Sequence, residues 1–289
     1  KYERQNMAKV KERTMHIVFL VAACMSILAV AMICLFMFAN GVPAIRKIGF
    51  VNFIFGKTWM PGANKFGIFP MIIGSIYVTA GAIIIGVPIG LLCAIFMAKF
   101  CPPKLHQIMK PAVDLLAGIP SIVYGFFGLV VITPMIRNAF GGSGKNILTA
   151  CILLGIMILP TIISVSESAI RAVPESYYEG ALALGDTHER SVFKAVLPAA
   201  KSGILAAIIL GIGRAIGETM AVIMIAGNHP VLPDSLLAGV RTLTSNIVLE
   251  LGYATDLHRE ALIATGVVLF VFILIINLLF SVVKKKGVK

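Results

Sequence analysis

Charged side chains are scarce in this sequence. Only 13% of its 289 residues are Asp, Glu, Lys or Arg, about half the usual share of a soluble domain, whereas 58% are apolar. The mean hydropathy is +0.96. So few polar side chains cannot cover the surface of a soluble fold of this length. The composition therefore excludes a soluble domain, a disordered chain, a collagen and a coiled coil, and it predicts an integral membrane protein with several spans.

Acidic residues and paired cysteines are also lacking. The chain has 13 Asp plus Glu against 25 Lys plus Arg, a formal net charge of +12. In a soluble domain this balance would suggest nucleic acid, but basic residues at the ends of membrane spans hold orientation against anionic lipid. We therefore expect membrane lipid and no nucleic acid as a partner. The five cysteines form no CxxC pair and are read as small apolar residues, without a disulfide or metal site.

Long apolar stretches are what the sequence does contain. Six of them approach the roughly 20 residues that a helix needs to cross a bilayer, near 17–39, 71–98, 112–136, 147–166, 202–227 and 262–283. The first lacks an evident cleavage site, and we expect it to remain as an anchor. The predicted organisation is a tail, first span and external segment at 1–70, a transmembrane domain at 71–283 and a basic tail at 284–289.

The distribution of basic residues predicts the orientation. Sixteen Lys and Arg fall on the side that holds the two tails, and eight fall on the other side. By the positive-inside rule both termini are predicted to be cytoplasmic.

Soluble-enzyme signatures are absent. His188-Glu189 lacks the second His of a zinc helix, and Gly141–Lys145 lacks both the first Gly and the Ser or Thr of a phosphate loop. We predict no catalytic residue, no metal site and no cofactor in this chain, so that ATP and magnesium would belong to a partner ATPase.

The segment between the fourth and fifth spans is the most informative. Pro174 and Gly185 suit the start and the end of a short helix at 175–184, and a second amphipathic turn is predicted to end at Pro198. This segment resembles the EAA loop of ABC-importer permeases: Glu-Ala-Ala, three residues, Gly, nine residues, Ile, one residue, Leu-Pro. The matching positions are Glu179, Ala181, Gly185, Leu197 and Pro198. Gly180 and Ala195 depart from the pattern.

Three further stretches narrow the resemblance. Gly118–Gly125, Gly211–Val222 and Arg241–Thr244 are similar to the PstC family, the permeases of phosphate-specific ABC importers, and the similarity runs from about residue 71 to the end. It implies an all-α, six-helix membrane protein with a type I ABC-importer (MetI-like) core, in the cell membrane of a prokaryote. It also implies a PstA-like second permease, a PstB-like ATPase dimer on cytoplasmic coupling helices and a PstS-like external phosphate-binding protein.

Two charges within the fifth span stand out independently of any family. Arg214 and Glu218 are four residues apart and are predicted to lie on one helical face, close enough to pair. Charges within a span usually face a partner or a water-filled path, and Arg suits bidentate recognition of phosphate. A structural ion pair and a place on an anion path both remain open. Ser121, Tyr124 and Thr219 are further candidates for the substrate pathway.

Taken together, the residues and the resemblance predict a permease subunit that conducts inorganic phosphate inward by alternating access and does no covalent chemistry. A permease of the same fold for another anion or small solute is the first alternative. An ion-driven secondary transporter is the second, although neither an internal repeat nor paired broken helices are evident.

Overall fold

The computed structural model describes residues 2–286, and most of them are helical. The helices are α1 (Tyr2–Ile48), α2 (Phe50–Ile54), α3 (Phe69–Ile95), α4 (Pro103–Gly118), α5 (Ser121–Phe127), α6 (Thr133–Phe140), α7 (Ile147–Arg171), α8 (Glu175–Ala183), α9 (His188–Ser191), α10 (Leu197–Gly217), α11 (Met220–Ile225), α12 (Leu243–Glu250) and α13 (Asp256–Lys286). Between α2 and α3, strands β1 (Trp59–Met60) and β2 (Lys65–Phe66) pair antiparallel around the 3-10 turn η1 (Pro61–Ala63). The predicted all-α class is confirmed, with this hairpin as a small addition.

Six helical stretches within the described residues are long and apolar enough to span a membrane. They are Lys11–Ile48, Phe69–Phe100, Ser121–Phe140, Ile147–Arg171, His188–Gly217 and Asp256–Leu279. The number and the approximate positions agree with the sequence prediction. Of the basic tail predicted at 284–289, residues 284–286 belong to α13 and residues 287–289 lie outside the described residues.

The centre of the bundle is the contact between α3 and α7. Glycines on α3 allow this approach, since a Cβ at Gly86 would lie 2.7 Å from Cγ1 of Ile158 on α7. A Cβ at Gly90 would likewise lie 2.9 Å from Cγ2 of Ile162. Small residues at such contacts let two helix backbones pack closely, and α7 is accordingly the most buried of the six candidate spans.

Three π-helical turns each precede a proline by two residues. They are η2 (Phe96–Phe100) before Pro102, η3 (Gly128–Ile132) before Pro134 and η4 (Val192–Val196) before Pro198. A proline has no N–H and its ring crowds the preceding turn, and a widened turn relieves both problems. In η4 the Leu197 N–H donates to the Val192 carbonyl, so the helix continues through Pro198 into α10. The prediction that Pro198 ends a helix was therefore wrong.

Two predicted spans are interrupted. The span predicted at 112–136 is broken at Pro120, because α4 ends at Gly118 and α5 begins at Ser121. Pro120 cannot donate a backbone hydrogen bond and disfavours helical geometry in the residue before it. The prediction of one helix over 202–227 was wrong, because α10 ends at Gly217 and α11 begins only at Met220.

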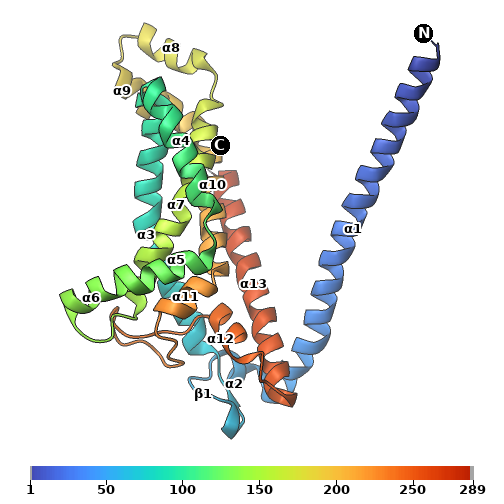
Figure 1. The fold of residues 1–289 in the computed structure, drawn as a ribbon, viewed down its shortest axis with the longest axis vertical. Helices are drawn as coiled ribbons and strands as arrows, with labels where there is room; N and C mark the ends of the chain where they lie inside the picture. The colour runs from blue at the N-terminus through green and yellow to red at the C-terminus, as the bar shows by residue number, and fades with distance from the viewer. Residues whose placement is uncertain (1, 287–289) are drawn as a thin grey trace.

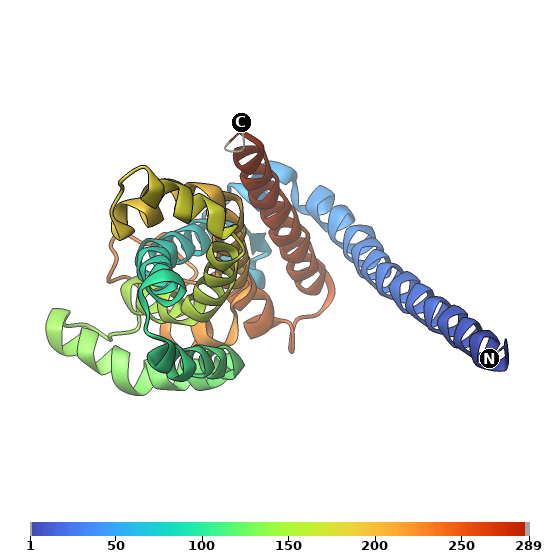
Figure 2. The same ribbon diagram turned by 90° about the horizontal axis from the view of Figure 1, so that it is seen from above.

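Figures 1 and 2 show how these pieces are arranged. The rod formed by α5, η3 and α6 lies across the bundle at a steep angle to α3 and α7, while α4 runs beside them. Helix α1 diverges from the bundle and meets α13 only near its own C-terminal end, where Gly41 faces Val267. Helices α8 and α9 lie at the end of the molecule toward which the N-terminus of α1 and the C-terminus of α13 also point. The β hairpin and α12 lie at the opposite end (Figure 1).

Candidate functional site

Glu218 lies in the gap between α10 and α11 and is only 8% exposed. Its Oε1 accepts hydrogen bonds from the backbone N–H groups of Thr219 (3.1 Å) and Ala221 (3.2 Å). The carboxylate thus satisfies N–H groups at the start of α11, where a negative charge is also favoured by the helix dipole. Its other oxygen, Oε2, accepts from the Ser121 hydroxyl at 2.9 Å.

Hydroxyl groups complete the structure around this gap. The Thr219 Oγ1 donates to the Gly217 carbonyl at 3.2 Å, and the Thr244 Oγ1 donates to the Glu218 carbonyl at 3.2 Å. These carbonyls no longer have helical partners, because the chain leaves the helix at Glu218. Of the predicted pathway residues, Ser121, Glu218 and Thr219 are therefore brought together at one point.

Arg214 does not pair with Glu218, so the prediction that the two lie on one helical face close enough to pair was wrong. The i, i+4 geometry requires a continuous helix, but Glu218 has an extended backbone (φ −70°, ψ 126°) directly after α10. The partly buried Arg214 instead donates from Nη1 to Thr161 Oγ1 on α7 at 3.3 Å. Within the described part of the chain no carboxylate forms an ion pair with this guanidinium. Most of its donors therefore remain available to an anion.

Tyr124 supports the other break. Its ring is buried at 6% exposure, and its hydroxyl donates to the Leu116 carbonyl at 2.8 Å. In an uninterrupted helix this carbonyl would accept from residue 120, but Pro120 has no N–H. Tyr124 thus replaces the missing donor, so that its hydroxyl is used within the protein.

The predicted coupling segment has the expected first helix. Helix α8 (Glu175–Ala183) is followed by Leu184 and then by Gly185 with φ +88°. The Gly185 N–H donates to the Leu182 carbonyl (2.9 Å) and the Asp186 N–H donates to the Ala181 carbonyl (3.2 Å). These two bonds form a Schellman motif, which requires the left-handed residue at Gly185.

Most of the predicted coupling residues are at least partly exposed. Glu179, Gly185 and Pro198 are exposed, whereas Ala181 and Leu197 are half-buried. Leu197 packs against the cluster of Ile95, Ile170, Val173, Val192, Val196 and Ala200. The Tyr178 hydroxyl is 2.7 Å from Nδ1 of His188, and this bond holds α8 against α9. Glu179, Ala181 and Gly185 thus lie in the projecting segment formed by α8 and α9. Leu197 and Pro198 lie where η4 continues into α10.

The sequence prediction missed a polar cluster between α4 and α7. Glu167 is only 3% exposed and contacts three basic side chains, those of His106, Lys110 and Arg171. A local signal existed, because His106, Lys110 and Asp114 recur every four residues and therefore share one face of α4.

Another buried carboxylate, that of Glu250, lies at the opposite end of the molecule. Glu250 accepts from Trp59 Nε1 at 2.8 Å and from His258 Nε2 at 2.8 Å, and it pairs with Arg241. Burial raises the pKa of Glu250, but hydrogen bonds from Trp59, His258 and Arg241 and the charge of Arg241 outweigh it. The pKa therefore lies below its ordinary value of 4.5. These contacts tie the β hairpin, α12 and α13 together.

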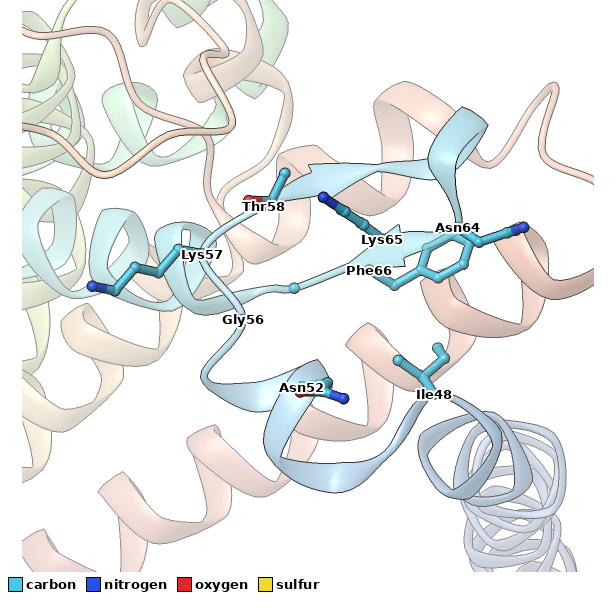
Figure 3. A pocket seen from close by; sticks show the side chains of 9 residues that line it. Ile48, Asn52, Gly56, Lys57, Thr58, Asn64, Lys65 and Phe66 are labelled. Carbon is cyan, nitrogen blue, oxygen red and sulfur yellow. The ribbon is translucent and has the colours of Figure 1, made fainter.

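The same end carries a basic recess of about 290 Å³ beside the β hairpin. Figure 3 shows Asn52, Thr58 and Lys65 around it, with Lys57 at its side. No acidic residue lines it. Its charge suits an acidic or anionic partner.

Together, the interrupted spans, the buried polar breaks and the projecting helical pair define a polytopic membrane transporter subunit. The family model described as "Binding-protein-dependent transport system inner membrane component" matches residues 86–287. The chain belongs to this family of permeases. The resemblance seen in the EAA-like segment is thereby confirmed.

Named relatives cover nearly the whole chain. The "Probable ABC transporter permease protein YqgH" of Bacillus subtilis is 37% identical and covers 91% of this chain and 89% of its own. The "Phosphate transport system permease protein PstC" of Mesorhizobium japonicum is 34% identical, with coverage of 88% and 84%. The "Probable phosphate transport system permease protein PstC" of Methanocaldococcus jannaschii is 31% identical, with coverage of 84% and 84%.

Solved structures agree on the fold. An inward-facing methionine ABC transporter, MetNI, matches with a TM-score of 0.55 at 21% identity, over 74% of this chain and 91% of its own. A bacterial alginate ABC transporter matches with a TM-score of 0.58 at 14% identity, over 91% and 96%. At these identities the likeness concerns the fold alone.

Proposed function

We propose that this chain is the PstC-type permease subunit of an ATP-driven importer of inorganic phosphate, and that Arg214 is the group that meets the anion. The observation that carries the proposal is the environment of Arg214, a cation on a candidate span that has one hydroxyl partner and no carboxylate pair among residues 2–286. A guanidinium with available donors matches the oxygens of phosphate geometrically and electrostatically. The names of the relatives supply the substrate class.

Glu218 and Ser121 have a different role in this proposal. Their hydrogen bond joins the gap between α10 and α11 to the break between α4 and α5. Backbone that is not helical is tolerated within a membrane only where it is buried or lines a cavity. We therefore place the path for phosphate beside these two breaks, with Thr219 at the start of α11 and Arg214 one turn before the gap.

The coupling segment defines the rest of the complex. In the proposed assembly an ATPase dimer of the PstB type receives α8 and α9, and that dimer supplies ATP and magnesium. A PstA-type permease pairs with this chain, and a PstS-type binding protein delivers phosphate to the end that carries the basic recess. Both termini and α8 then lie in the cytoplasm, in agreement with the excess of basic residues on that side.

The substrate is tested by reconstituting the complete importer in lipid vesicles and measuring ATP-driven uptake of phosphate and of sulfate. We expect uptake of phosphate and little uptake of sulfate. Preference for sulfate, or for another small solute, would identify a permease of the same fold with a different cargo.

The orientation is tested separately with an impermeant thiol reagent. In a variant without its native cysteines, a cysteine at Lys57 should react from outside intact cells, and one at Glu189 should react only after lysis. Reaction of the two positions in the reverse order would refute the proposed orientation.

A further inference from the structure

The polar cluster between α4 and α7 has a defined composition and geometry. His106, Lys110 and Asp114 lie along one face of α4, and Ser164, Glu167 and Arg171 lie along one face of α7. Oε1 of Glu167 is 2.6 Å from His106 Nε2 and 3.0 Å from Arg171 Nε, and Oε2 is 3.2 Å from Lys110 Nζ. The Ser164 hydroxyl lies between Lys110 and Asp114, at 3.3 Å from each.

Glu167 is the hub of this cluster. It is buried, whereas the side chains of His106, Lys110 and Arg171 are 25%, 31% and 47% exposed. Two of these three basic groups, His106 and Lys110, come from α4, so neutralising Glu167 removes two charged contacts between α4 and α7 at once. Such a buried, hydrogen-bonded group fixes a register between helices more than it adds net stability.

Arg171 extends the cluster to a third element. Its Nη2 donates to the buried Met97 carbonyl in η2 at 2.8 Å. In η2 the Cys101 N–H donates to the Phe96 carbonyl, five residues earlier. By the same π-helical spacing the Met97 carbonyl would accept from Pro102, which has no N–H. Arg171 donates to this carbonyl instead.

The cluster lies between the coupling helix and the candidate pathway. Arg171 is the last residue of α7, and α8 begins at Glu175, which Lys99 of η2 contacts at 3.3 Å. On the other side, α4 leads directly to the break at Pro120 and to Ser121, which bonds Glu218. A displacement of α8 that moves the end of α7 therefore reaches α4 through Glu167.

We propose that Glu167 is a positioning residue for energy coupling. It locks the end of α7 and η2 to α4, so that movement of α8 displaces α4 and, through it, the bond between Ser121 and Glu218. This inference rests on the proposed docking of an ATPase on α8 and α9. Without Glu167, α8 still moves with the ATPase but α4 no longer follows.

The test uses the complete importer reconstituted in vesicles, with Glu167→Gln as the variant and Ser168→Ala, an exposed neighbour on the same helix, as the matched control. Because coupling free energies between sites commonly correspond to factors of about 5–150, we expect Glu167→Gln to lower phosphate carried per ATP hydrolysed by at least about fivefold. Basal hydrolysis and the amount of ATPase bound should stay unchanged. Glu167→Asp, which keeps the charge, should recover part of the ratio.

A distance measurement separates coupling from simple destabilisation. Spin labels at Leu184, directly after α8, and at Leu115 on α4 are each paired with one at Leu278 on α13, in the chain without native cysteines. All three positions are exposed. On ATP binding, both distances should change in the parent protein. In Glu167→Gln only the Leu184 distance should still change.

Two outcomes overturn the inference: a normal ratio of transport to hydrolysis in Glu167→Gln, or a change at Leu115 equal to that of the parent protein. If Glu167→Gln does not reach the membrane, Arg171→Gln replaces it and is judged by the same two measurements, with Arg171→Lys as the conservative variant. Failure of the parent complex to couple hydrolysis to phosphate uptake would instead contradict the proposed function itself.

Discussion

The hydroxyl of Ser121 donates to Oε2 of Glu218 at 2.9 Å, and this bond joins the ends of two interrupted helical segments that lie 97 residues apart in the sequence. Each break has its own internal support. Glu218 bonds the first N–H groups of α11, and Tyr124 bonds the carbonyl that Pro120 leaves unpaired. The polar site around Ser121 and Glu218 therefore lies in non-helical backbone, whereas α3 and α7 contact each other as continuous helices.

The absence of an Arg214–Glu218 ion pair leads to a prediction about stability. Arg214→Gln and Glu218→Gln should change the free energy of unfolding additively, within about 0.5 kcal/mol, because the two side chains share no partner. Reversible denaturation of both single variants and the double variant in mixed micelles provides the comparison. A coupling energy of several kcal/mol would instead show that Arg214 and Glu218 interact directly, as the sequence suggested.

Transport should respond differently from stability. Arg214→Gln, alone or combined with Glu218→Gln, should assemble with the other subunits and carry no phosphate, because the anion loses this guanidinium. Uptake is measured at matched membrane levels of the proteins. Uptake near that of the parent protein would move the phosphate site away from Arg214, and we would then look to the second permease.

Tyr124→Phe should weaken the break at Pro120. Without the hydroxyl, the Leu116 carbonyl keeps only the long bond from the Ile119 N–H at 3.4 Å. The Leu116 residue is 42% exposed, so the cost is that of one ordinary hydrogen bond, about 0.5–1.5 kcal/mol, and we expect thermal unfolding at a correspondingly lower temperature. Phe126→Leu, at an exposed position of the same helix, is the control. Equal unfolding temperatures for Tyr124→Phe and the parent would show that the bond contributes nothing.

Local signals in the sequence predicted part of this arrangement. Pro174 and Gly185 predicted the two ends of α8 to within one residue. The approximate positions of the spans follow from the lengths of the apolar stretches. Both signals depend only on residues that are neighbours in the sequence. The gap at Glu218 could not be predicted in this way. The apolar pattern continues through it, and the partner that stabilises it, Ser121, is distant in sequence.

The contacts of the buried carboxylates Glu167 and Glu250 differ in how far they were predictable from the sequence. Glu167 faces a stripe of polar residues on α4 with four-residue spacing, which a comparison of helix faces would have detected. Glu250 meets Trp59 across 191 residues, and no local pattern marks that contact. Only the packing of the hairpin against α12 brings them together.

Gly185→Val should disturb the coupling segment through the backbone alone. No atom lies within 4 Å of a Cβ at this position, but φ is +88°, where a β-branched residue is strained by about 1–2 kcal/mol. We expect α8 to be misplaced, with less ATPase recovered with the permease and lower uptake per ATP hydrolysed.

Two glycine variants are the controls for this experiment. Gly185→Asn should be tolerated, since Asn adopts left-handed geometry more readily. Gly180→Ala, inside α8 and equally open, should stabilise the helix by about 0.5–1 kcal/mol. Normal coupling in Gly185→Val would mean that the Schellman motif is dispensable for docking.

The last prediction concerns acid and the cluster around Glu250. Its pKa is lowered in the folded protein, so its contribution to stability is present above the ordinary value of 4.5 and is lost as the pH falls through the lower, folded value. Trp59 donates directly to this carboxylate and is the single tryptophan of the chain, so its fluorescence reports the protonation. In an acid titration we expect the emission of Trp59 to change only below 4.5. Glu250→Gln should abolish this step and, by leaving the partly buried Arg241 without its counter-charge, should destabilise the protein at neutral pH by up to about 3–5 kcal/mol, the cost for a buried pair. A step with its midpoint above 4.5, or one that persists in Glu250→Gln, would show that Glu250 does not hold the hairpin and α12 together as an ionised group.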